Sequence, residues 1–126
     1  MFFIVIMMKK NVLIDRSFAF AVRIVKLYQH LLDKKEFVLS KQMLRSGTSI
    51  GANIREAQNA ESKNDFIHKL AISQKECEET MYWLELLQET NFLTKYEFDA
   101  INKDAQEILK MLRSAILTAK NKTRNK

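Results

Sequence analysis

The sequence predicts an all-α fold, an antiparallel up-down-up-down four-helix bundle that forms a single domain. A chain of 126 residues is long enough to bury one hydrophobic core and too short for two. Proline is absent and glycine occurs only twice, so the chain lacks the turn residues that sheets and loop-rich folds require. Four segments repeat apolar residues at steps of three and four, the period of a helix with one buried face.

The first helix is expected to begin at Asp15 or Ser17, because either short side chain can accept hydrogen bonds from the free amides of a first turn. It is expected to end at Lys34 and Lys35, where positive charge suits the negative end of the helix dipole. Its expected apolar positions are Phe18, Ala21, Val25, Tyr28 and Leu32.

The other three helices have stricter patterns. The second begins near Ser40, with Met43, Gly47, Ile50, Ile54 and Ala57 on one face. The third follows a capping box of Ser62 and Asp65, with Phe66, Leu70, Ser73, Cys77, Thr80, Leu84 and Leu87 on one face. The fourth follows a box of Thr94 and Glu97, with Phe98, Ile101, Ala105, Ile108, Leu112, Ala115 and Ala119 on one face. Short connections make sequential helices antiparallel neighbours.

The two ends of the chain differ from this pattern. Residues 1–8 form an apolar run without the flanking charge and cleavage site of a signal peptide, and eight residues cannot span a bilayer, which takes roughly 20. We treat residues 1–14 as an N-terminal extension. Our interpretation is that Met8, and not Met1, is the true start and that residues 1–7 are a mis-assigned upstream extension; the alternative is that the run is a short membrane-surface anchor. Residues 120–126 are predicted to be a basic disordered tail.

The net charge of +6 is unevenly distributed. Residues 1–56 contain ten Lys and Arg against four Asp and Glu, whereas residues 57–119 contain seven against eleven. This pattern fits either solvated helix faces or a basic surface for nucleic acid. The candidate nucleic-acid-binding residues are Arg16, Arg23, Lys26, Lys41, Arg45 and Arg55. Arg45 and Arg55 can instead form structural ion pairs with Glu56, Glu76 or Glu79.

The chain lacks the residues that common catalytic and metal sites need. His30 and His68 are the only histidines, too few for the two Glu-x-x-His pairs of a di-iron bundle. Cys77 falls on a core face, where a thiol is usually inert. It is the single cysteine of the sequence, which excludes an internal disulfide. Two glycines cannot build a phosphate-binding loop. We therefore expect no catalytic residue, metal, cofactor or small-molecule substrate, and a cytoplasmic location.

Two features of the predicted helices indicate contacts. Gly47 and Gly51 lie one turn apart inside the second helix, where each glycine costs about 1 kcal/mol relative to alanine. They predict close helix packing, with a helix break at 46–48 as the alternative. On the third helix, a flank mixes a tryptophan with charges, a composition typical of an oligomer interface. Its members are Lys69, Ile72, Glu76, Glu79 and Trp83. The alternative is that Trp83 covers the bundle edge.

Two segments of the sequence resemble a known family. Residues 44–56 read LRSGTSIGANIRE and residues 66–84 read FIHKLAISQKECEETMYWL. Both are similar to the second and third helices of the bacterial four helix bundle protein family, which includes proteins encoded in intervening sequences of 23S ribosomal RNA. The chain departs from many members in having Gly51 instead of proline and Ala57 instead of glycine, and it lacks an early tryptophan.

The resemblance implies a cytoplasmic homo-oligomer, commonly a pentameric ring, without enzymatic activity. A related branch, the accessory variability determinants of diversity-generating retroelements, associates with RNA and a reverse transcriptase through a basic surface. We therefore expect a ring-like homo-oligomer that binds nucleic acid, with structured RNA or a ribonucleoprotein as partner. The alternative is a protein-interaction scaffold with no nucleic-acid role.

Overall fold

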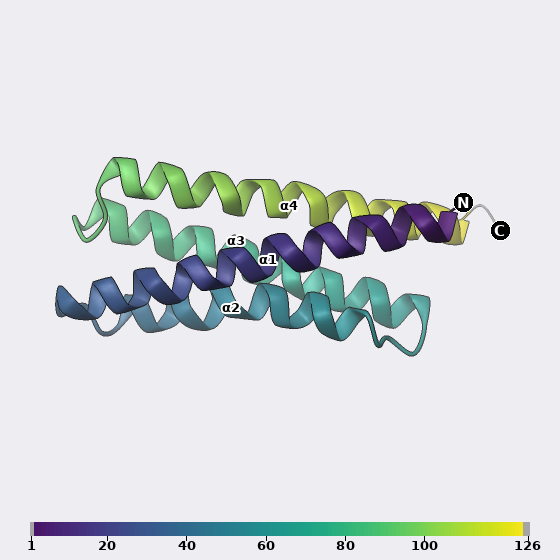
Figure 1. Ribbon diagram of the computed structural model, residues 1–126, viewed down its shortest axis with the longest axis horizontal. Helices are drawn as coiled ribbons and strands as arrows, with labels where there is room; N and C mark the ends of the chain where they lie inside the picture. Colours follow the sequence, from purple (N-terminus) through teal and green to yellow (C-terminus); the bar gives the residue numbers. More distant parts are fainter. Residues whose placement is uncertain (1, 125–126) are drawn as a thin grey trace.

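The computed structural model describes the backbone of residues 2–124 and the side chains of residues 12–121. It contains α1 (Phe2–Asp33), α2 (Leu39–Ala57), α3 (Lys63–Glu89) and α4 (Lys95–Arg124). The helices run alternately up and down, and the α1–α2 and α3–α4 connections lie at the same end of the bundle (Figure 1). This arrangement confirms the predicted all-α four-helix bundle. None of the described helices combines the length and apolarity needed to cross a membrane.

Each helix packs against its neighbours around the bundle. In the described chain α1 contacts α2 and α4, and α3 contacts α2 and α4. Helices α1 and α3 are therefore diagonal in the bundle, with no close backbone approach to each other, as are α2 and α4. The outward faces of α1 and α3 consequently point to opposite sides of the molecule.

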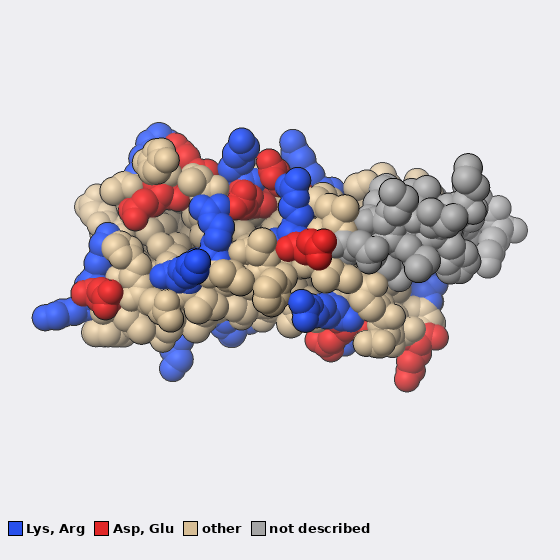
Figure 2. All heavy atoms as spheres, in the orientation of Figure 1, with Lys and Arg blue, Asp and Glu red and all other residues tan. Residues whose placement is uncertain are grey.

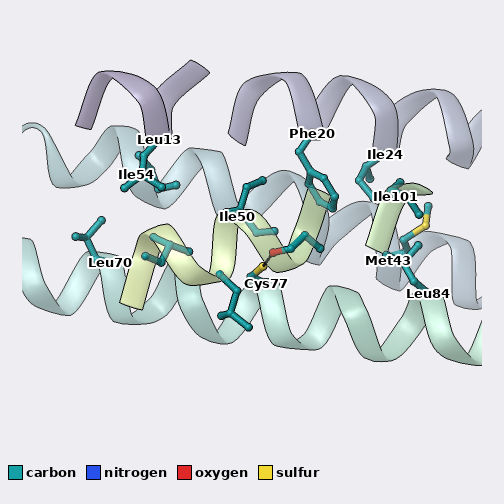
Figure 3. Packing of buried hydrophobic residues seen from close by; sticks show 14 of the residues in the cluster. Leu13, Phe20, Ile24, Met43, Ile50, Ile54, Leu70, Cys77, Leu84 and Ile101 are labelled. Carbon is teal, nitrogen blue, oxygen red and sulfur yellow. Dashed lines mark hydrogen bonds between the residues drawn. The ribbon is translucent and has the colours of Figure 1, made fainter. Parts of the chain in front are cut away.

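The predicted apolar faces of α2, α3 and α4 line the core. All their positions are buried except Phe66, Phe98 and Ala115, which are half-buried. Figure 3 shows side chains from all four helices meeting in the interior, with Leu13 beside Ile54 and Met43 beside Leu84. One core therefore accounts for the single domain.

Helix α1 differs from the prediction in its start and in its buried face. It begins at Phe2, so Asp15 and Ser17 lie inside it, and the Ser17 hydroxyl donates to the Ile14 carbonyl at 3.2 Å. The predicted core positions Phe18 and Val25 are 55% and 38% exposed. The buried face of α1 instead carries Leu13, Ser17, Phe20, Ile24 and Leu31. Both faces repeat at the helical period, which is why the period alone selects the wrong one.

The observed C-terminal end of the domain also differs from the predicted one. Helix α4 continues to Arg124, so the segment from Lys120 to that residue is helical and not disordered. Residues 125 and 126 lie outside the described chain. The side chains of Met1 and Met8 lie outside the described side chains. The choice of the true start codon therefore remains a prediction.

Side chains and backbone geometry define the helix ends. Ser62 accepts a hydrogen bond from the Asp65 amide at 3.1 Å, and Thr94 and Glu97 exchange amide hydrogen bonds at 2.9 and 3.1 Å. The Thr94–Glu97 capping box is confirmed, whereas at the start of α3 the Asp65 carboxylate accepts from the Glu61 amide at 3.2 Å and not from Ser62. The start of α2 is capped by Glu36, which sequence reasoning missed because glutamate is not a usual capping residue. Its carboxylate accepts from the amides of Val38, Leu39 and Ser40 at 3.2, 2.8 and 2.7 Å.

Candidate nucleic-acid interface

The predicted close packing involves α1. A β-carbon at Gly47 would lie 2.9 Å from two side-chain carbons of Ile24, and one at Gly51 would lie 3.3 Å from the Ser17 hydroxyl. Helix α2 is unbroken through this region. The two glycines therefore let α1 approach α2 closely, with Ile24 and Ser17 directly against the α2 backbone.

Small hydroxyl side chains join α2 to α3. Ser73 donates to the Ile50 carbonyl at 2.8 Å, and Thr80 donates to the Ser46 hydroxyl at 2.8 Å. Every buried side-chain nitrogen or oxygen of the described residues has a hydrogen-bond partner. These buried bonds link the middle two helices of the chain along one seam.

Charged residues flank the same α2–α3 seam, and they include most of the predicted oligomer patch. Arg45 contacts Glu76 at 3.1 Å and also pairs with Glu79, while Lys69 lies 3.2 Å from Glu56. The Trp83 indole donates to Glu79 at 3.0 Å. This indole bond and the Arg45 contact together outweigh desolvation and hold the pKa of Glu79 below its usual range.

Contacts within the chain thus engage four members of the predicted patch: Lys69, Glu76, Glu79 and Trp83. Ile72 is half-buried. The part that these residues play in assembly stays a prediction.

The six candidate basic residues do not form one continuous surface, because their contacts lead to different helices. Arg16 lies 2.7 Å from Glu107, and Arg23 pairs with Asp104, so both face α4. On α2, Arg45 pairs with α3, and the Arg55 guanidinium carbon lies 5.1 Å from the Phe18 ring centroid. Among the described side chains, Lys26 and Lys41 form no ion pair.

The ion pairs reduce the positive field of these residues. On the face drawn in Figure 2, Lys and Arg side chains are interspersed with Asp and Glu. The sequence left open whether these residues form structural ion pairs or a basic surface. Arg45 forms ion pairs, whereas Lys26 and Lys41 are exposed cations without an ion pair among the described side chains.

A groove between α1 and α4 brings together residues that the sequence did not connect. It has a volume of about 370 Å³ and is lined by Arg23, Lys26, Leu27, His30, Tyr96, Glu97, Ala100 and Ile101. Tyr96 is 85% exposed, and a smaller hollow along the same seam is lined by Arg16 and Arg23. In the sequence, the one available signal for this site is Tyr96, an aromatic residue in the first turn of α4 outside the predicted apolar face.

The chemistry of the groove is mixed. Leu27, Ala100 and Ile101 supply apolar surface, while Arg23 and Lys26 supply cations. Glu97 lies 3.9 Å from the His30 imidazole. Hydrogen bonds from Thr94, chiefly its backbone amide, outweigh desolvation and lower the pKa of Glu97, aided by the charges of Lys34 and His30. Glu97 is thus a capping carboxylate that remains charged and offsets part of the positive charge.

The buried thiol of Cys77 donates to the Ala105 carbonyl at 3.3 Å (Figure 3). Desolvation raises the pKa of Cys77 to about 12, with a smaller contribution from Glu78, so the thiol stays protonated at neutral pH. Among the described residues, no three of His, Cys, Asp and Glu gather in a way that could hold a metal ion. Cys77 therefore packs as a small core residue.

Comparisons with known proteins identify relatives of the chain. A crystal structure at 1.70 Å resolution, of a protein of unknown function from the S23 ribosomal protein family of Bacteroides thetaiotaomicron, is 59% identical. The match covers 86% of this chain and 97% of that one, with a TM-score of 0.85. No curated protein matches the chain. The sequence profile of the 23S rRNA-intervening sequence proteins matches residues 9–114. The chain therefore belongs to the 23S rRNA-intervening sequence protein family.

Proposed function

We propose that this protein is a non-enzymatic RNA-binding protein that self-associates into a ring and binds unpaired nucleotides of a structured RNA in the α1–α4 groove. Its family is named for sequences within 23S ribosomal RNA, and its solved relative is assigned to a ribosomal protein family. These names support ribosomal RNA as the partner class. They do not identify the surface, which has to come from the chain itself.

The observation that carries the proposal is Tyr96 at the rim of the groove. An exposed aromatic ring gives an unpaired base a surface on which to stack, and such stacking contributes about 1–3 kcal/mol per base. Lys26 lines the same groove and can contact the adjoining phosphate, whereas Arg23 beside it is paired with Asp104. Because proteins that recognise RNA sequence mostly contact unpaired loops and bulges, a stem–loop fits this site better than a duplex.

The ion pairs determine how strong the electrostatic contribution can be. Arg16, Arg23 and Arg45 already contact carboxylates, so few cations are free to neutralise phosphates. We therefore expect a shallow dependence of RNA affinity on salt, with about one phosphate contact from Lys26 in each subunit. A ring would multiply this weak site, since several subunits can bind one RNA at once.

The test is RNA binding measured by fluorescence anisotropy with a labelled stem–loop and a blunt duplex of the same length. Tyr96→Ala should weaken stem–loop binding about tenfold, while Tyr96→Phe should retain it because the ring still stacks. Lys26→Ala should reduce the slope of log affinity against log salt by about one. Arg45→Ala serves as the matched control, because Arg45 is engaged with Glu76 and Glu79 on another face.

The scaffold alternative is favoured by one observation, the neutralisation of Arg16, Arg23 and Arg45 within the chain. If neither RNA binds at low salt, or if Tyr96→Ala binds as tightly as the unaltered protein, the groove proposal is wrong. Absence of binding to either RNA would make a protein-interaction scaffold the better account of the fold.

A further inference from the structure

The Glu97 carboxylate has one oxygen that no described residue uses. Its Oε1 atom accepts a hydrogen bond from the Thr94 amide at 2.9 Å, as part of the capping box at the start of α4. Its Oε2 atom accepts no hydrogen bond from the described residues, and the His30 Nε2 nitrogen at 3.9 Å is too far to donate one. The side chain is 36% exposed and lines the α1–α4 groove. The cap therefore holds the carboxylate in place and leaves one oxygen free for a ligand.

The residue before Glu97 supplies a stacking surface for the same groove. Tyr96 is 85% exposed and lines the groove together with Glu97. The two residues are one step apart on α4, which places them about 100° apart around the helix axis. A base that stacks on the Tyr96 ring can therefore meet the Glu97 carboxylate with its edge. This pairing of a stacking ring with a hydrogen-bonding group is how proteins recognise single unpaired bases.

The other wall of the groove comes from α1. Lys26 lines it and forms no ion pair with the described side chains, so its ammonium group is available for a phosphate. His30 lines it as well, and an imidazole nitrogen can donate a hydrogen bond. The groove volume of about 370 Å³ lies within the range of small-ligand sites, about 300–1,000 Å³. A stacking ring, a carboxylate, an imidazole and a cation thus surround a space that can hold one nucleotide.

The four RNA bases present different groups to a carboxylate. On its Watson–Crick edge, guanine carries two adjacent donors, N1–H and the N2 amino group, which match the two oxygens of a carboxylate. Adenine and cytosine place a ring-nitrogen acceptor beside their amino group, and uracil flanks its single N3–H donor with two carbonyl oxygens. These acceptors repel a carboxylate, whereas hydrogen bonds to an ionised acceptor are strong. Oε1 of Glu97 can serve as the second acceptor because a carboxylate oxygen has two lone pairs. Guanine is therefore the base that best complements this groove.

We infer that the α1–α4 groove selects an unpaired guanine, which stacks on Tyr96 and donates hydrogen bonds from N1 and N2 to the Glu97 carboxylate. The guanine O6 atom accepts a hydrogen bond from His30, and Lys26 contacts the adjoining phosphate. The inference rests on the proposed binding of RNA in this groove and adds the identity of the base. It does not depend on the oligomeric state of the protein.

The test compares stem–loop RNAs that differ in a single loop nucleotide. The stem is constant, the loop is otherwise uridine, and the variable position carries guanine, adenine, cytosine or inosine. Fluorescence anisotropy with the full chain should find the tightest binding for guanine, and binding weaker by about tenfold or more for adenine and cytosine. Inosine retains the N1 donor and O6 but lacks the N2 amino group, so its affinity should lie between those of guanine and adenine.

Glu97→Gln tests whether the carboxylate causes the preference. Glutamine also forms capping boxes, so circular dichroism should show unchanged helix content. Because the amide offers one neutral acceptor, guanine binding should weaken and the guanine-to-adenine ratio should fall to about threefold or less. The matched control is Glu85→Gln on α3, an exposed position outside the groove, which removes the same charge and should retain the full ratio. His30→Ala should weaken guanine and inosine binding alike, because both bases carry O6, and should leave adenine binding unchanged.

The results separate this inference from the proposed function. Stem–loop binding that depends on Tyr96 but is equally tight for all four loop nucleotides overturns the guanine assignment and leaves the proposed function intact. Equal affinity for guanine and inosine, measured with the unaltered protein, also overturns it, as does a guanine preference that persists in Glu97→Gln. If none of the stem–loops binds at low salt, both the proposed function and this inference are wrong.

Discussion

Ile24 of α1 occupies the space that a side chain at Gly47 of α2 would need. Alanine at position 47 would place its β-carbon 2.9 Å from both Cγ1 and Cγ2 of Ile24, a fully buried residue that cannot move aside cheaply. The better helix propensity of alanine contributes about 1 kcal/mol, while overpacking a core costs about 1–3 kcal/mol. We therefore expect Gly47→Ala to lower the free energy of unfolding by about 1 kcal/mol, as measured by urea denaturation.

Gly51→Ala is the matched control for this prediction. Its β-carbon would lie 3.3 Å from the Ser17 hydroxyl and 3.5 Å from the next nearest atoms, so it fits with a small shift. We expect it to be neutral or slightly stabilising. If Gly47→Ala proved as stable as Gly51→Ala, the close contact between α1 and α2 would not be the reason for the glycine.

Glu36→Gln tests the buried cap of α2. Burial raises the pKa of Glu36, but hydrogen bonds from Ser40, Leu39 and Val38 outweigh it and bring the pKa below its usual range. A carboxylate with a lowered folded-state pKa stabilises the fold above its unfolded value of about 4.3, and this contribution is lost as the pH falls through the folded value. Glu36→Gln should therefore cost about 1 kcal/mol at neutral pH.

The stability difference between Glu36→Gln and the unaltered protein should narrow as the pH falls below the unfolded-state pKa of about 4.3 and through the lower folded-state pKa. Thermal unfolding of both proteins across this range measures it. Glu79 and Glu97 titrate in both proteins, so their contributions cancel in the difference. A difference that stayed constant with pH would show that charge at Glu36 does not stabilise α2.

Thr80→Val tests the hydroxyl contacts between α2 and α3. Valine has nearly the same shape but lacks the hydroxyl, which lies 2.8 Å from the Ser46 hydroxyl and 2.7 Å from the Glu76 carbonyl. A buried hydrogen bond contributes about 1 kcal/mol net, so Thr80→Val should destabilise the protein by about 1–2 kcal/mol in urea denaturation. Thr80→Ser, which retains the hydroxyl, should lose less. A Thr80→Val loss no larger than that of Thr80→Ser would mean that the hydroxyl stabilises the protein no more than the methyl group does.

The two apolar faces of α1 can be distinguished by a pair of alanine substitutions. Phe20 is fully buried and Phe18 is more than half exposed. Phe20→Ala should lower the free energy of unfolding by about 3–5 kcal/mol, whereas Phe18→Ala should lower that of the monomer by less than about 1 kcal/mol. Chemical denaturation at a concentration below assembly measures both. The reverse order would mean that α1 is rotated relative to the structure.

Helices α2, α3 and α4 were predictable because each has one apolar face with no competitor. Helix α1 was not, because Phe18, Val22 and Val25 repeat as regularly as Phe20, Ile24 and Leu31. The choice between these faces depends on α2, where the glycines admit Ile24, and a pattern within one helix does not contain that information.

The candidate site was less predictable for a related reason. Arg16 and Glu107 form an ion pair, and Lys26 and Tyr96 line one groove, although the members of each pair are far apart in the sequence and come together only on folding. Composition located the basic residues but could not reveal which of them are neutralised. The sequence pattern did not predict the capping role of Glu36, because that role comes from backbone geometry. Three backbone amides point toward the one carboxylate.

The hollowed α1–α4 seam has a consequence for the order in which the bundle forms. Its ion pairs join residues 81 and 91 positions apart, whereas α2 and α3 are joined by a short connection and share buried hydroxyl bonds. Closing a long loop costs more entropy than closing a short one, so the central hairpin is favoured to form early and the first and last helices to meet late. In the native protein, this hollowed seam is where amide hydrogens should exchange first, and an RNA bound in the groove would slow that exchange.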